Sequence, residues 1–249
     1  MTSTTAMRTF HTLALAAALT AASPGAQAQA LSNGDFSAGL AGWQVLGDAS
    51  VQNDAGGNEL WLTNASLDFE DDFPLPAGAL NRSGQGAATS GLESFIGIAG
   101  GALDPDPANG LQAYEGTAVL QSFSAAAGDT LSFNWDFGTS DNFADYAFAV
   151  VDGQLFRLGG SGEATLPGRL GNQLQTGAQS FSFSFASGGM HSVAFGVVDV
   201  GDYNVTSTLA VSGVQVVPVP EPSALLLMLA GIGVVAGSAR RRISLSSQT

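Results

Sequence analysis

Residues 130–137 read TLSFNWDF and carry the clearest structural pattern in the sequence. Every second residue is apolar and the residues between are polar, which places Leu131, Phe133, Trp135 and Phe137 on one side. Successive side chains of a β-strand point to opposite faces, so this alternation predicts a strand with one buried face. The same period recurs in SFSFSF (180–185) and SVAFGVV (192–198).

Further strand patterns and turn signals surround this stretch. Asp152-Gly153 stands between YAFAVV and QLFRL and predicts a tight hairpin, and Gly213 interrupts the last strand pattern as a candidate bulge. Several short strands with turn signals between them predict an all-β domain, a β-sandwich or jelly roll. A single helical pattern, residues 91–100, predicts one short helix that caps the sandwich. The additional predicted strands are 118–123, 146–151 and 208–217.

Composition excludes several classes of function. The chain has no cysteine, which removes disulfides, thiol nucleophiles and cysteine zinc sites. After signal-peptide removal it would keep one histidine, His191, which we expect in a solvated turn, so neither a serine triad nor a histidine zinc site is supported. Residues 31–217 carry three arginines against 20 acidic residues, a net charge of −17. Nucleic acid is therefore not an expected partner, because phosphate binding needs clustered cations.

Both ends of the chain have the composition of targeting segments. Residues 1–30 resemble a secretory signal peptide, with cleavage predicted after Ala30 or, as the alternative, Ala28. Residues 223–239 carry no charge and would form a helix about 25 Å long at about 1.5 Å per residue. Three arginines follow this segment and predict a cytoplasmic end, so the acidic domain would face outward from a membrane anchor.

The C-terminal segment resembles the PEP-CTERM sorting signal. The resemblance rests on Pro220-Glu221-Pro222, the apolar segment and the cluster Arg240, Arg241 and Arg242, in that order. It implies export in a bacterium that makes extracellular polysaccharide, with a membrane-embedded exosortase as the partner that recognises the motif. The chain then divides into a signal peptide (1–30), a β-sandwich domain (31–217), the sorting signal (218–242) and a short tail (243–249).

The middle of the chain resembles galactose-binding-like, carbohydrate-binding jelly rolls. The resemblance rests on NGDFSAGLAGWQV (33–45), on residues 113–137 followed by YAFAVVDG, and on TLAVSGVQVV (208–217). It implies a jelly-roll fold, and a fold leaves ligand and activity open.

Oxygen-rich loops predict a calcium site. Calcium takes six to eight oxygen ligands, which loops rich in Asp and Asn supply. The spacing does not match an EF-hand, and turn formation without any ion is the alternative. The candidate ligands are Asp136, Asp141 and Asp145 in one loop region and Asp199 and Asp202 in another.

Exposed aromatic side chains are the candidate platforms for a glycan: Trp61, Tyr114 and Tyr203. Core packing is the alternative for each, and we expect it for Trp43. With 20 acidic residues, some carboxylate pair will have a separation that suits glycoside hydrolysis by chance, so such a pair is no evidence of hydrolysis.

We therefore predict a non-enzymatic protein, held first at the inner membrane and then sorted to the cell surface or matrix. The leading hypothesis is a structural or adhesive component of the exopolysaccharide matrix. The alternatives are a lectin-like glycan-binding module and, less favoured, a glycoside hydrolase.

Overall fold

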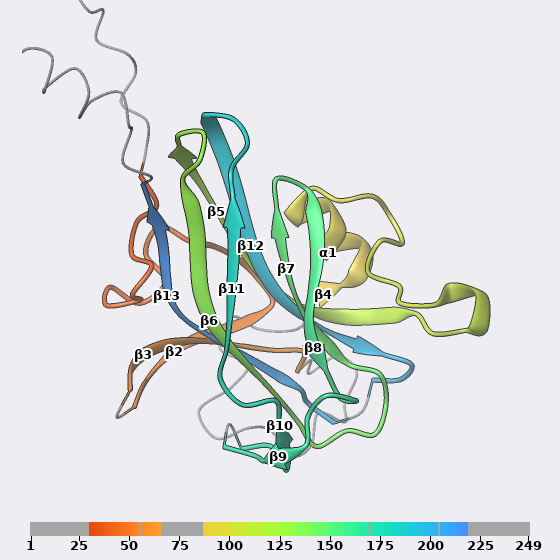
Figure 1. Cartoon of the computed structure of the whole chain (residues 1–249). Helices are drawn as coiled ribbons and strands as arrows, with labels where there is room; N and C mark the ends of the chain where they lie inside the picture. Colours follow the sequence, from red (N-terminus) through yellow and green to blue (C-terminus); the bar gives the residue numbers. More distant parts are fainter. Residues whose placement is uncertain (1–29, 55, 66–86, 170, 204, 219–249) are drawn as a thin grey trace, which may run out of the picture.

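The computed structural model describes residues 30–54, 56–65, 87–169, 171–203 and 205–218. Two antiparallel β-sheets pack face to face, which confirms the predicted β-sandwich (Figure 1). The six-stranded sheet runs in the order β1 (Gln44–Leu46), β5 (Ala113–Ala125), β12 (Gly189–Val200), β7 (Tyr146–Val151) and β8 (Gln154–Gly160), and β4 (Ala87–Ala88) also pairs with β5.

The seven-stranded sheet carries the stretch that opened the sequence analysis. Its order is β2 (Asp48–Asp54), β3 (Gly57–Thr63), β13 (Thr208–Val217), β6 (Thr130–Thr139), β10 (Leu174–Gln175) and β9 (Leu166–Pro167). A further strand, β11 (Gln179–Ser184), pairs with β6 alongside β10. The central strand β6 thus pairs with β11 on one side, where two regular alternating patterns lie next to each other, and with β13 on the other.

The core lies between the sheets, as the alternation predicts. Leu131, Phe133 and Phe137 of β6 are buried there against Phe195 of β12 and Leu209 of β13. Trp43 is also in this core, 6% exposed, and its ring contacts the rings of Phe36 and Phe195, which confirms the expectation of core packing.

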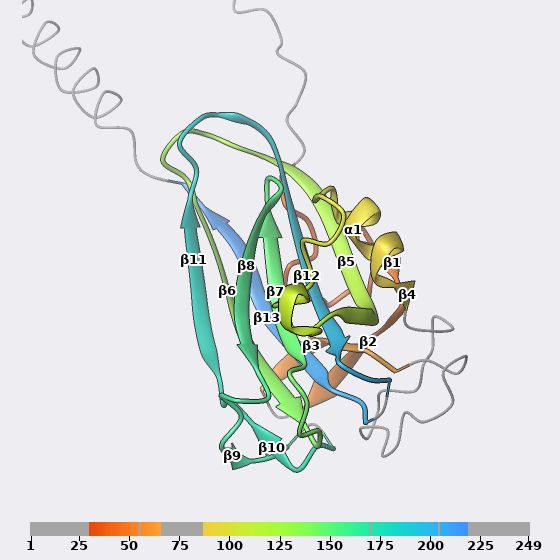
Figure 2. The ribbon, with the colours of Figure 1, turned by 90° about the vertical axis from the view of Figure 1, so that its right-hand side faces the viewer.

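The helix is present, but it does not cap the sandwich. α1 (Thr89–Ile96) lies on the outer face of the six-stranded sheet (Figure 2), where Leu92 and Ile96 join a second buried cluster with Phe148. It ends at Gly97, which adopts a left-handed conformation with φ 75°. The helix lies there because several even-numbered residues of β5, β7 and β12, among them Ala118, Phe148 and Val198, are apolar, so this outer face also needs cover.

Two local predictions are confirmed. Asp152 and Gly153 both have positive φ, 51° and 77°, as a tight hairpin between β7 and β8 requires. Gly213 has φ 61° and lies where the β13–β6 register shifts, so it is a β-bulge. A short 3₁₀ helix, η1 (Pro107–Asn109), lies in the segment between α1 and β5.

The two ends of the described domain lie together. The Val214 amide near the end of β13 donates to the Gly34 carbonyl at 2.9 Å. The chain therefore enters and leaves the sandwich at one end. Among the described residues there is no helix long and apolar enough to cross a membrane. The predicted signal peptide and sorting segment, apart from residues 30 and 218, lie outside these residues.

Candidate functional site

A row of side chains crosses the outer face of the seven-stranded sheet. Strand register pairs Ser50 with Trp61, Trp61 with Ala210, and Ala210 with Asp136. These residues alternate with core residues such as Leu60, so they point away from the core. The register therefore joins β2, β3, β13 and β6 into one surface.

Trp61 is half-buried in this row and its orientation is fixed. Its indole Nε1 donates to Glu59 Oε2 at 3.2 Å, and Glu59 lies on the same face two residues earlier. The outward neighbours on the described strands are polar, among them Gln52, Asn134 and Ser212. Trp61 is thus an aromatic surface surrounded by hydrogen-bonding groups.

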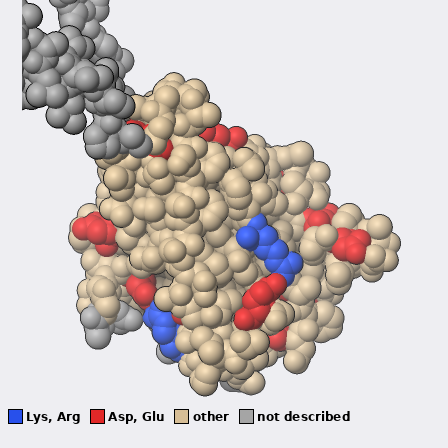
Figure 3. Space-filling model, in the orientation of Figure 1, with Lys and Arg blue, Asp and Glu red and all other residues tan. Residues whose placement is uncertain are grey.

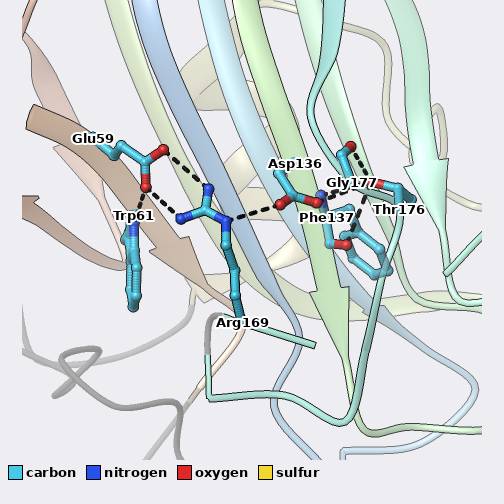
Figure 4. Close-up of polar contacts among 7 residues, drawn as sticks. All are labelled: Glu59, Trp61, Asp136, Phe137, Arg169, Thr176 and Gly177. Atoms are coloured by element: carbon cyan, nitrogen blue, oxygen red, sulfur yellow. Dashed lines mark hydrogen bonds and ion pairs between the residues drawn. The ribbon is translucent and has the colours of Figure 1, made fainter. Parts of the chain in front are cut away.

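Arg169 connects this platform to β6. It lies in the loop between β9 and β10 and binds Glu59 with both terminal nitrogens, Nη1 to Oε2 at 2.9 Å and Nη2 to Oε1 at 3.0 Å (Figure 4). Its Nε donates to Asp136 Oδ2 at 3.1 Å. Because Glu59 and Asp136 lie on either side of β13, the arginine spans that strand, and the small Ala210 leaves room for it.

Asp136 is the buried end of this network. It is 3% exposed, and its Oδ1 accepts from Thr176 Oγ1 at 3.2 Å. Burial raises the pKa of Asp136, while the hydrogen bond and charge of Arg169 oppose that rise. Two carboxylates and one guanidinium are therefore held rigidly beside Trp61, in the bidentate geometry that gives arginine pairs their specificity.

A second cluster lies inside the sandwich, at the end opposite the chain termini. Glu115 of β5 pairs in register with Asp199 of β12, and Asp145 directly precedes β7 on the other side of β12. All three carboxylic residues are 0% exposed. In the alternation of β5, β12 and β7, these three residues fall at positions that face the interior of the sandwich. Acidic groups therefore occupy a layer that is otherwise hydrophobic.

Neighbouring polar groups bind this cluster of buried carboxyls. The amide of Asn64 donates to Asp145 Oδ2 at 3.1 Å and to Asp199 Oδ2 at 3.2 Å. Asp145 also accepts from Ser207 Oγ at 2.7 Å. Two other buried oxygens, Asp199 Oδ1 and Thr206 Oγ1, have no hydrogen-bond partner in the described part of the chain.

Burial dominates the electrostatics of this cluster. It raises the pKa of Asp199 to about 10, and the charge of Asp145 acts in the same direction. Burial likewise raises the pKa of Asp145 to about 7, against the hydrogen bond from Ser207. Two carboxyls that share a site cannot both ionise readily. Burial therefore favours the protonated form of Asp199, unless a cation takes the place of its proton.

The structure brings together some of the predicted calcium ligands. Asp145 and Asp199 share one donor, and the charges of Asp141 and Asp202 reach Asp199. Asp136 is elsewhere, bound to Arg169. Within the described ranges, no group of three or more acidic, histidine or cysteine side chains has the arrangement to hold a metal ion.

The predicted aromatic platforms separate into two places. Tyr114 and Tyr203 contact each other, with ring centroids 4.7 Å apart, near the buried carboxyls. Trp61 lies in the row on the seven-stranded sheet.

The expectation that His191 lies in a solvated turn was wrong. His191 is 8% exposed, and its Nδ1 lies 2.7 Å from Asp152 Oδ2.

Sequence reasoning missed several members of both sites. Glu59 and Arg169 are 110 residues apart, and Asn64 and Asp199 are 135 apart. Neither pair belongs to a local motif. The one usable signal was the alternation of ELWLTN (59–64), which predicts that Glu59 and Trp61 share a face.

Comparison with known protein families identifies the sorting signal. Residues 218–242 match the PEP-CTERM protein-sorting motif, with the boundaries predicted. This motif indicates an exported protein that is sorted at the membrane. No curated protein matches the sequence.

Among solved structures, the chain is similar to three carbohydrate-binding modules. TmCBM61, solved with β-1,4-galactotriose, is 10% identical with a TM-score of 0.40, covering 77% of this chain and 99% of that one. CBM28, specific for non-crystalline cellulose, is 11% identical with a TM-score of 0.35, covering 77% and 96%. A CBM4 module is 13% identical with a TM-score of 0.30, covering 73% and 97%.

Proposed function

We propose that this exported protein is a non-catalytic, glycan-binding component of the extracellular polysaccharide matrix. The glycan would bind on the outer face of the seven-stranded sheet. The observation that carries the proposal is Trp61, an aromatic side chain fixed by Glu59 in a row of polar residues. This joins the matrix-component hypothesis with its lectin-like alternative.

The chemistry of the face suits a sugar ring. A binding site needs an apolar surface with a few well-placed polar groups that set orientation. The ring of Trp61 supplies the apolar surface, and the partly exposed carboxylate of Glu59 can accept hydrogen bonds from hydroxyls. Because Arg169 already holds both carboxylates in place, little ordering is left for the binding step, and preorganisation of this kind favours affinity.

The position of the face favours access to a matrix. Trp61 pairs with Ala210, and β13 runs on from there to Val217, where the sorting signal begins. At about 3.3 Å per residue, roughly 23 Å of strand separates the platform from that end. A protein tethered through its C-terminus would therefore present Trp61 away from the membrane.

The same network argues against hydrolysis. Glycosidases need one carboxylic acid able to donate a proton and a second carboxylate free to act as base or nucleophile. Both oxygens of Glu59 accept from Arg169, and Asp136 is bound by Arg169 and Thr176. This pair serves better as a fixed hydrogen-bonding surface.

The proposal is tested by affinity electrophoresis of the full-length protein against a panel of polysaccharides that includes β-1,4-galactan and non-crystalline cellulose. At least one glycan should retard the protein, and Trp61→Ala should weaken that retardation at least tenfold. Phe143→Ala is the matched control, because Phe143 is 49% exposed in a separate loop. Absence of binding to every glycan, or undiminished binding by Trp61→Ala, would overturn the proposal.

We also propose that a hard divalent cation such as calcium binds the buried carboxyls. Asp145 and Asp199, with the hydroxyl of Thr206, offer oxygen ligands of the kind that calcium prefers, and the unpartnered oxygens of Asp199 and Thr206 support this fit. The ion would supply the positive charge that the cluster needs when both aspartates ionise.

Calcium binding to the folded state would raise the melting temperature. We expect millimolar CaCl₂ to raise it above the value in chelator, and Asp199→Asn to abolish the difference. An equal melting temperature in both solutions would show that only a proton occupies the cluster.

A further inference from the structure

We infer that the Trp61 face selects uncharged glycans and rejects acidic ones, because Arg169, the only cation on this face among the described residues, is already neutralised. This inference rests on the proposed glycan-binding function and deepens it by naming the class of ligand. Three observations support the inference. Both described arginines are paired with carboxylates, Arg169 binds Glu59 with both terminal nitrogens, and the surface around Trp61 carries negative charge.

The described residues contain two arginines, and the whole chain contains no lysine. Arg157 pairs with Glu163 at 3.5 Å and lies over the ring of Tyr146 at 5.2 Å. Arg169 pairs with Glu59 and Asp136. On the face shown in Figure 3, basic side chains appear at two places, each beside an acidic side chain. Each described arginine is therefore already paired with a carboxylate of the protein.

The geometry of Arg169 makes this neutralisation firm. Its two terminal nitrogens bind both oxygens of Glu59, which is the fork geometry an anionic sugar would itself need. An acidic glycan would have to displace Glu59, and the displaced carboxylate would remain on the same face. Glu59 is only 16% exposed in its side chain, so water compensates poorly for the lost partner.

The charge of the surface acts in the same direction. Glu59, Asp136 and Arg169 together carry one net negative charge, within a domain of strongly negative sequence charge. Like charges facing each other across an interface oppose binding, and this repulsion is a common source of specificity. The hydroxyls of a neutral sugar instead donate to the carboxylate oxygens. The ligand class is thus a neutral polysaccharide without uronate, sulfate or phosphate groups.

The test compares two polymers that share a backbone and differ in charge. Full-length protein is run in affinity gels with hydroxyethylcellulose and carboxymethylcellulose, and in a second pair with dextran and dextran sulfate. In whichever pair binds, we expect the neutral polymer to bind at least tenfold more tightly than the acidic polymer at low salt. The difference in affinity between the two polymers should narrow at 0.5 M NaCl, because salt screens the repulsion between the acidic polymer and the protein.

Glu59→Gln tests the role of Arg169. Glutamine keeps an acceptor for Trp61 and removes the charge that occupies the guanidinium, so relative affinity for the acidic polymer should rise at least fivefold. Asp136→Asn is the second variant should Glu59→Gln fold poorly. Glu163→Gln is the matched control: it removes the same charge beside the other arginine, and should leave the preference unchanged.

The outcomes separate the inference from the proposed function. Binding of the acidic polymer as tightly as the neutral one would overturn the inference and leave glycan binding intact, provided that Trp61→Ala abolishes both. Binding to neither polymer of any pair would overturn the proposed function itself. The ratio of affinities for the neutral and the acidic polymer could also be the same in all three variants, Glu59→Gln, Asp136→Asn and Glu163→Gln. That result would show that Arg169 does not set the selectivity.

Discussion

One side-chain amide connects two buried acids: Asn64 Nδ2 lies 3.1 Å from Asp145 Oδ2 and 3.2 Å from Asp199 Oδ2. Asn64 directly follows β3, whereas Asp199 lies in β12 of the opposite sheet and Asp145 directly precedes β7 of that sheet. The contact therefore ties the two layers of the sandwich together at the end far from the chain termini. Because burial disfavours the charged form of both acids, this link makes stability depend on pH.

We predict that the protein loses stability between pH 5 and pH 8 in chelator. The folded pKa values of Asp145 and Asp199, about 7 and about 10, lie above the unfolded value of about 3.9. The folded state therefore binds more protons across this range, and the free energy of unfolding falls as pH rises, by up to about 1.4 kcal/mol per pH unit for each proton.

Urea unfolding at pH 5, 6, 7 and 8 measures this slope. Asp199→Asn removes one of the two titrations, so its slope should be clearly shallower than that of the wild type. A free energy of unfolding that rises through this range, or an unchanged slope in the variant, would contradict the assignment.

Asn64→Ala should destabilise the fold by about 2–4 kcal/mol. It removes a donor shared by two buried acids and the acceptor Oδ1 that binds the Ser207 amide at 2.7 Å. Buried groups left without a partner typically cost about 1–3 kcal/mol each. Asn58→Ala, which removes an exposed contact to Asn53, is the control and should change stability by less than about 0.5 kcal/mol. Equal effects of the two variants in urea unfolding would refute this.

Gly196→Ala should destabilise the protein by about 1–3 kcal/mol through overpacking. An added Cβ at Gly196 would lie 2.2 Å from the ring of Phe148, whose side chain is fully buried under α1. Gly162→Ala is the matched control, since its Cβ would meet nothing within 4 Å. Thermal unfolding of both variants gives the comparison, and a similar melting temperature for the two would mean that Phe148 moves aside freely.

Processing at the sorting motif should remove the C-terminal segment. Intact-mass measurement of the secreted protein is expected to show loss of the chain from about Pro220 onward. Replacing Pro220, Glu221 and Pro222 by alanine should leave the full-length protein in the inner membrane. Secretion of the alanine variant with the same mass as the wild type would contradict recognition of this motif.

The elements that could be predicted are those with a local cause. The alternation in 130–137 identified β6, and the bounds 208–217 of the last strand pattern are those of β13. The hairpin at Asp152-Gly153 followed from residues that tolerate positive φ. In contrast, the place of α1 required knowing that the six-stranded sheet has apolar residues on both faces, which becomes visible only when β5, β12 and β7 lie together.

Strand periodicity, turn chemistry and charge are properties of neighbouring residues, so the class of fold, the acidic composition and the sorting signal could be predicted from the sequence alone. Which side chains act together depends on the folded arrangement. Arg169 reaches Glu59 across β13, and Asn64 reaches Asp199 across the sandwich, because sheet order and register bring distant segments into contact. Those arrangements depend on how the whole core packs, and no short stretch of sequence encodes them.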